Sequence, residues 1–139
     1  MSTRNYVLLG LFLVLSLSIQ ASQVSSQEDT VRVTDMRFCI AVQNREPIGV
    51  DTVFADTVKK VYCFTLIEGA KDTTFVTHIW YHGTEKRAEV KLTVGSIRWR
   101  TWSSKRIMKE WVGKWRVEVV SAEGKILKTK EFYIKSQSE

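Results

Sequence analysis

Apolar and polar residues alternate with a period of two along most of the chain, beginning near residue 37. Because successive side chains of a β-strand point to opposite faces, this pattern predicts strands with one buried face. Clusters of glycine, asparagine and aspartate interrupt the pattern about every ten residues, as turns do. We therefore expect seven strands, over residues 37–42, 58–66, 75–82, 90–94, 97–102, 113–120 and 126–134.

Seven short strands within about 110 residues are typical of a two-layered antiparallel fold. The predicted fold class is all-β, a small immunoglobulin-like β-sandwich. One segment departs from the strand pattern: Lys105–Trp111 is a helix candidate that Ser103 or Ser104 could cap. The alternative for this segment is a single turn within a loop.

The chain begins with a segment that has the order of a secretory signal. Arg4 precedes an uncharged apolar run, Val7–Ile19, and small and polar residues follow it. This run is shorter than the roughly 20 residues that a membrane-spanning helix needs. We therefore expect a signal peptide over residues 1–21, a linker over 22–30 and one domain over 31–136. The predicted location is periplasmic or secreted, and the alternative is a membrane anchor formed by an uncleaved N-terminal helix.

The charge of the chain is basic and unevenly distributed. The formal net charge is +6, and removal of residues 1–21 with their single cation, Arg4, leaves 20 Lys and Arg against 15 acids, or +5. Residues 86–116 hold ten Lys and Arg but only Glu89 and Glu110 as acids. Such an excess attracts polyanions, unless it is simply a solvated face. Nucleic acid is not an expected partner, because an exported chain rarely meets it and no nucleic-acid-reading motif is present.

Two cysteines, Cys39 and Cys63, fall within predicted strands. An even number of cysteines in an exported chain is consistent with a disulfide. The alternative is a pair of buried free thiols, since cysteine is among the most buried residue types.

The most unusual segment is IRWRTWSSK, residues 97–105. On a strand, Arg98, Arg100 and Trp102 share one face, while Ile97, Trp99 and Thr101 share the other. Two guanidinium groups beside an indole can stack on a ring and pair with carboxylate or phosphate. The alternative is structural, with the arginines lying over Trp102 or pairing with acids of a neighbouring strand. The candidate ligand-binding residues of this segment are Arg98, Arg100, Trp102 and Lys105.

The strand over residues 75–82 adds His78 and Trp80 as candidate binding residues. His78 and His82 share a face, but four residues along a strand separate them by about 13 Å, too far to bind one metal ion. We therefore expect no metal site and no cofactor, and packing in the core is the alternative role of His78. The Ser-x-x-Lys spacing is absent because Arg106 occupies the lysine position after Ser103. No other catalytic spacing is present, so we expect that the protein is not an enzyme.

Several segments resemble an uncharacterised bacterial family, domain of unknown function 2914 (DUF2914). They are NREP from Asn44, VYCFT from Val61, VTHIW from Val76, RWRTWSSK from Arg98, GKWRVEV from Gly113 and EGKIL from Glu123. The resemblance implies one compact domain but no activity and no site residues.

The residues together predict an exported, non-catalytic binding or interaction module of the cell envelope. Its partner would be an envelope glycan, an anionic ligand such as a lipid head group, or a protein, with the membrane itself a partner only if the leader is uncleaved. The alternative is a structural or assembly protein that pairs through a strand edge.

Overall fold

The structure is a computed structural model that describes residues 30–138, so the predicted signal peptide and nearly all of the linker lie outside the described residues. The described chain is all-β. Its strands are β1 (Arg32–Cys39), β2 (Ala41–Gln43), β3 (Glu46–Ile48), β4 (Val53–Ala55), β5 (Lys60–Glu68), β6 (Thr74–His82), β7 (Glu85–Val94), β8 (Arg98–Arg106), β9 (Gly113–Ser121) and β10 (Ile126–Lys135).

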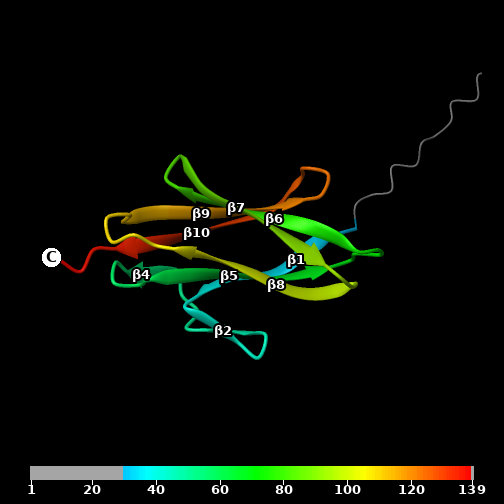
Figure 1. Cartoon of the computed structure of the whole chain (residues 1–139), viewed down its shortest axis with the longest axis horizontal. Helices are drawn as coiled ribbons and strands as arrows, with labels where there is room; N and C mark the ends of the chain where they lie inside the picture. The colour runs from blue at the N-terminus through cyan, green and yellow to red at the C-terminus, as the bar shows by residue number, and fades with distance from the viewer. Residues whose placement is uncertain (1–29, 139) are drawn as a thin grey trace, which may run out of the picture.

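These strands form two sheets that face one another and a small hairpin (Figure 1). One sheet has the order β1-β5-β8 and is antiparallel, and the other has the order β4-β10-β9-β6-β7. Within the second sheet only β4 runs parallel to its neighbour, β10. The β2–β3 hairpin stands outside the three-stranded sheet and packs against β5. The predicted β-sandwich is confirmed. The seven predicted strands correspond to β1 and β5–β10, with the strand expected over residues 37–42 divided between the end of β1 and β2. The strands β3 and β4, of three residues each, are additional.

The alternating pattern builds the core between the sheets. Trp80 of β6, Trp115 of β9 and Phe132 of β10 are fully buried, and from the other sheet they meet Phe38 and Ile67. The ring centroids of Phe38 and Phe132 lie 4.5 Å apart across the sandwich. Burial of each such side chain contributes about 1.5–3 kcal/mol, so this interior is the main source of stability.

The segment Lys105–Trp111 is not a helix. Its first two residues end β8, because the ladder with β5 continues as far as the pairs Val61–Lys105 and Lys60–Arg106. A loop follows, in which the Trp111 amide donates to the Met108 carbonyl over 2.9 Å. No helix in residues 30–138 is long and apolar enough to cross a membrane.

The two cysteines are free, buried thiols, and the predicted disulfide is not formed. In the β1–β5 ladder Cys39 is opposite Tyr62, whereas Cys63 is opposite Phe38. Because opposite residues share a face, this offset of one residue puts the two sulfurs on opposite faces of the sheet, and a disulfide requires Cβ atoms that face each other. Burial raises the pKa of both thiols.

Candidate functional site

The outer face of the three-stranded sheet carries the arginines of β8. Arg98, Arg100 and Trp102 lie on this face, while the alternate residues Thr101 and Ser103 are buried toward the other sheet. Ile97 precedes the strand and is 67% exposed, so it does not join the apolar side on which it was expected. The strand therefore presents its cations to solvent.

The β2–β3 hairpin brings a third arginine to the same place. Its two turn residues, Asn44 and Arg45, have φ angles of 50° and 62°, the left-handed pair that a two-residue hairpin loop requires. Arg45, Arg98 and Arg100 line one pocket of about 270 Å³. Sequence reasoning did not select Arg45, although the turn that holds it lies in the NREP segment.

Two glutamates fix the orientation of the β8 arginines. Nη1 of Arg98 lies 2.6 Å from Oε1 of Glu68, and Nη1 of Arg100 lies 2.7 Å from Oε1 of Glu46. The hydrogen bond from Arg98 and the positive charges nearby lower the pKa of Glu68. A guanidinium has five N–H donors, so each arginine keeps donors beyond those that these contacts use.

Arg45 is held differently, since its guanidinium carbon lies 5.7 Å from the centre of the Trp99 ring. Its backbone carbonyl accepts a 3.4 Å hydrogen bond from Arg100. The hairpin tip is thus attached to β8 at the pocket. We call Arg45, Arg98 and Arg100 the arginine pocket.

Trp102 lies beside this pocket but is engaged in packing. Its ring stacks on Phe64 with centroids 6.3 Å apart and an interplanar angle of 14°. On the next strand of the sheet, the guanidinium of Arg37 lies 5.7 Å from the same Phe64 ring. Phe64 is 2% exposed although it faces outward, because the β2–β3 hairpin packs over β5. Trp102 therefore supports the outer face of the sheet.

Lys105 lies away from the arginine pocket. It is seven residues from Arg98, roughly 23 Å along a strand. Its Nζ lies 5.3 Å from the centre of the Trp111 ring, and the Arg87 guanidinium lies 4.6 Å from the same ring. The structure thus separates Lys105 from the residues with which it was grouped.

His78 and Trp80 are in the core, where they join a chain of buried hydrogen bonds. Thr65 donates its hydroxyl proton to the Thr101 carbonyl over 2.8 Å, so it can only accept from Nε2 of His78, 3.2 Å away. His78 is then the Nε2–H tautomer, and Nδ1 accepts from Ser103 over 2.7 Å. Ser103 in turn accepts from Nε1 of Trp80 over 3.1 Å.

This chain of hydrogen bonds uses every ring and hydroxyl proton that it contains and links the two sheets. Burial lowers the pKa of His78 to about 4, so the ring is neutral at ordinary pH. Ser103 and His78 have the spacing of a nucleophile and its base, yet they are 5% and 0% exposed. Substrate cannot reach such a pair, so the arrangement serves the core.

No group of three His, Cys, Asp or Glu side chains in the described part of the chain is arranged to hold a metal ion. The arginine pocket is the candidate site, because three guanidinium groups line it and such groups bind anions.

Residues 73–134 match the model of DUF2914, described as a protein of unknown function. Comparison with curated proteins found no match.

The match to DUF2914 confirms the resemblance over the strands from β6 to nearly the end of β10. Arg98 and Arg100 lie within the matched range, whereas Arg45 and the NREP and VYCFT segments precede it. Two members of the arginine pocket thus come from the region that is similar to DUF2914, and the third comes from the hairpin before it.

Proposed function

We propose that the protein is an exported, non-catalytic binding module that holds an anionic group in the arginine pocket. The observation that carries this proposal is the convergence of three guanidinium groups, from β8 and from the hairpin turn, on one pocket of about 270 Å³. Guanidinium groups bind carboxylate and phosphate through paired hydrogen bonds. The ligand would be an acidic group carried by an envelope molecule, such as a sugar acid of a glycan.

Preorganisation supports this role. Glu46 and Glu68 fix Arg100 and Arg98 before any ligand arrives, so less side-chain entropy is lost on binding. The pocket is smaller than the roughly 300–1,000 Å³ of sites that enclose a drug-sized ligand. It therefore fits one charged group of a larger molecule.

The backbone of Arg45 gives further support. A residue other than glycine at φ 62° costs about 1 kcal/mol or more, and the second position of such a turn usually holds glycine. Strained residues of this kind are concentrated at ligand-binding sites. The strain is consistent with a side chain that the pocket uses.

Titration of the full-length protein with inorganic phosphate and with glucuronate, followed by NMR of the arginine Nε–H groups, tests the proposal. We expect the resonances of Arg45, Arg98 and Arg100 to shift with either anion. In the double variant Arg98→Gln, Arg100→Gln the remaining Arg45 resonance should no longer shift, while the spectrum keeps the dispersion of the fold.

A matched control is Lys125→Gln, Lys128→Gln, which removes the same charge from two exposed lysines of the other sheet and its turn. The proposal fails if neither anion shifts the three arginines, or if the control variant loses binding as strongly as the arginine variant.

A second candidate function is assembly through a strand edge. β8 is an edge of the three-stranded sheet and is regular over nine residues, so a partner strand could pair with its free backbone groups. Crosslinking in intact envelopes distinguishes the two functions. A single protein partner that is retained by the Arg98→Gln, Arg100→Gln variant would favour assembly.

A further inference from the structure

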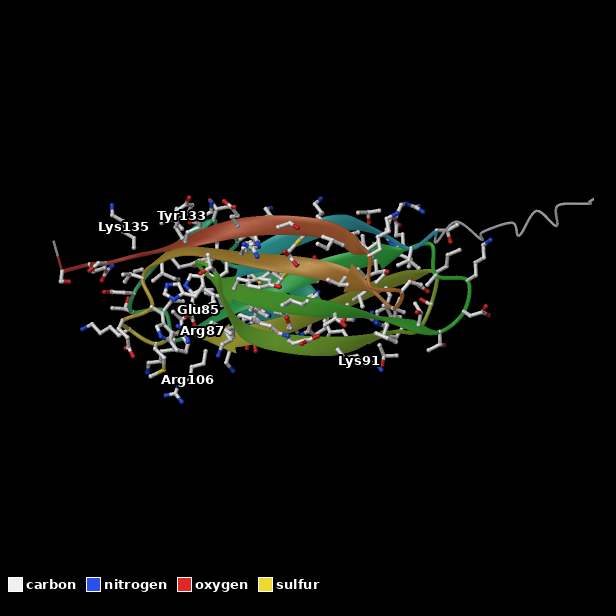
Figure 2. The ribbon with its side chains drawn as sticks, turned by 90° about the horizontal axis from the view of Figure 1, so that it is seen from above. Glu85, Arg87, Lys91, Arg106, Tyr133 and Lys135 are labelled. Carbon is white, nitrogen blue, oxygen red and sulfur yellow. The ribbon has the colours of Figure 1, made fainter. Side chains whose placement is uncertain are left out.

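A groove of about 760 Å³ lies at the end of the sandwich where β5 begins and β8 ends. Its walls are the β4–β5 and β8–β9 loops, which are joined where the Ile107 amide donates to the Lys59 carbonyl over 3.0 Å. It is lined by Asp56, Thr57, Val58, Lys59, Lys60, Arg106, Ile107, Met108 and Lys109. Figure 2 shows Arg106 at this end of the molecule, opposite the end where the described chain begins. We call this feature the basic groove.

The cations of the basic groove are not neutralised. Lys59, Lys60, Arg106 and Lys109 are all exposed, and none of them takes part in an ion pair within residues 30–138. Lys60 and Arg106 are directly opposite each other in the β5–β8 ladder, where like charges destabilise a sheet. An anionic partner would remove this repulsion.

Few acidic residues lie at the basic groove. Asp56 is the only acid that lines the basic groove, and Glu110 follows Lys109 in the same loop. Asp56 is 7% exposed, and its Oδ1 has no hydrogen-bond partner among the described residues. Because this carboxyl group is buried, the exposed charge that lines the groove is that of its four cations.

Exposed aliphatic side chains accompany these cations. Met108 and Val112, both in the β8–β9 loop, are 40% and 39% exposed. A surface that combines lysines and arginines with aliphatic side chains matches the interface of a phospholipid bilayer. A glycan or nucleic acid would instead favour exposed aromatic rings for stacking, whereas Trp111 of this loop is half-buried beneath Arg87 and Lys105.

We propose that the basic groove docks the protein onto a bilayer of anionic phospholipids. The four cations would contact the phosphates of lipids such as phosphatidylglycerol, and Met108 would enter the interface. This surface shares no residue with the arginine pocket, so the two proposals stand or fall separately.

The test places an environment-sensitive fluorophore at the groove of the full-length protein. Because Cys39 and Cys63 are buried, the variant Met108→Cys can be labelled at the new thiol alone. We expect its fluorescence to rise with vesicles of phosphatidylglycerol and phosphatidylcholine, to stay unchanged with pure phosphatidylcholine, and to fall back at high salt. Attachment through the apolar N-terminal segment alone would not require anionic lipid, so it would also occur with pure phosphatidylcholine and would persist at high salt.

Charge variants in the labelled background make the test specific. Each cation near an anionic membrane raises the affinity about fivefold. The double variant Lys59→Gln, Lys109→Gln should therefore need roughly 25-fold more lipid for a half-maximal rise in fluorescence. The control Lys125→Gln, Lys128→Gln has the same net charge but is altered at the other end of β10, and it should respond like the parent, as should Arg98→Gln, Arg100→Gln.

Three results would overturn the proposal. One is the absence of a response to phosphatidylglycerol, and another is an equal loss of response in the control at Lys125 and Lys128. The third is saturation of the groove by a soluble sulfated polysaccharide while vesicles have no effect, which would assign the groove to an acidic glycan instead.

Discussion

The buried histidine makes the stability of this protein sensitive to pH in a defined direction. His78 donates from Nε2 to Thr65 and accepts at Nδ1 from Ser103, and burial lowers its pKa from 6.5 to about 4. In the unfolded chain the ring regains a pKa near 6.5. Between these two values the unfolded state binds a proton that the folded state does not bind. The free energy of unfolding therefore falls as the pH falls from 6.5 to about 4, and above 6.5 the histidine contributes no pH dependence.

The size of this effect follows from the two pKa values. At about 1.36 kcal/mol per pH unit, full protonation of the unfolded chain lowers the stability by about 3 kcal/mol. At pH 5 the same relation gives a loss of about 2 kcal/mol. The free energy of unfolding of a typical protein is only about 5–15 kcal/mol. We therefore expect protonation of this single ring to dominate the onset of unfolding by acid.

Urea unfolding of the wild type and of His78→Gln, measured from pH 8 to pH 4.5, tests this reasoning. Glutamine keeps one donor and one acceptor but does not titrate. We expect the wild type to lose about 2 kcal/mol relative to the variant between pH 8 and pH 5. If the free energy of unfolding changes with pH equally in the wild type and in His78→Gln, the role of His78 is refuted. Should the variant not fold, nitrogen NMR of the wild-type ring gives the same answer, because a ring that gains a proton above pH 5.5 contradicts the buried neutral tautomer.

Other expectations follow from the same contacts. Ser103→Ala leaves Nε1 of Trp80 and Nδ1 of His78 without partners and should cost about 2–4 kcal/mol in chemical denaturation, whereas Ser104→Ala should change stability by less than about 0.5 kcal/mol. Arg45→Gly relieves the left-handed backbone, so stability should stay level or rise by up to about 1 kcal/mol while phosphate binding weakens. Destabilisation beyond 1 kcal/mol would contradict that strain. Cys39 and Cys63 should resist alkylation in the native protein and both react in urea without reductant, and unreactive cysteines in urea would indicate a bridge.

Local pattern was sufficient to predict the strands and the faces of β8. The side-chain period of a strand is a property of the backbone, so the sequence predicts that Arg98, Arg100 and Trp102 share a face without knowledge of any neighbour. Turn residues likewise predict the ends of β6 and β7, and those of β5, β9 and β10 to within two residues, whereas β1 ends three residues earlier and β8 four residues later than predicted. The short strands β2, β3 and β4 have three residues each, too few to show a period.

The pairing of strands that are distant in the sequence decided which of these residues come together. The register of β1 against β5 separates the two thiols, and a shift of one residue would have put them on the same face. Arg45 meets Arg100 from 55 residues away because the hairpin packs on the outer face of the sheet. The continued ladder with β5 extends β8 through Lys105 and Arg106, which places a cation at the basic groove. Register and sheet packing are long-range properties, so the sequence predicted a basic excess over residues 86–116 but not that Arg45, Lys59 and Lys60 join it in the two candidate sites.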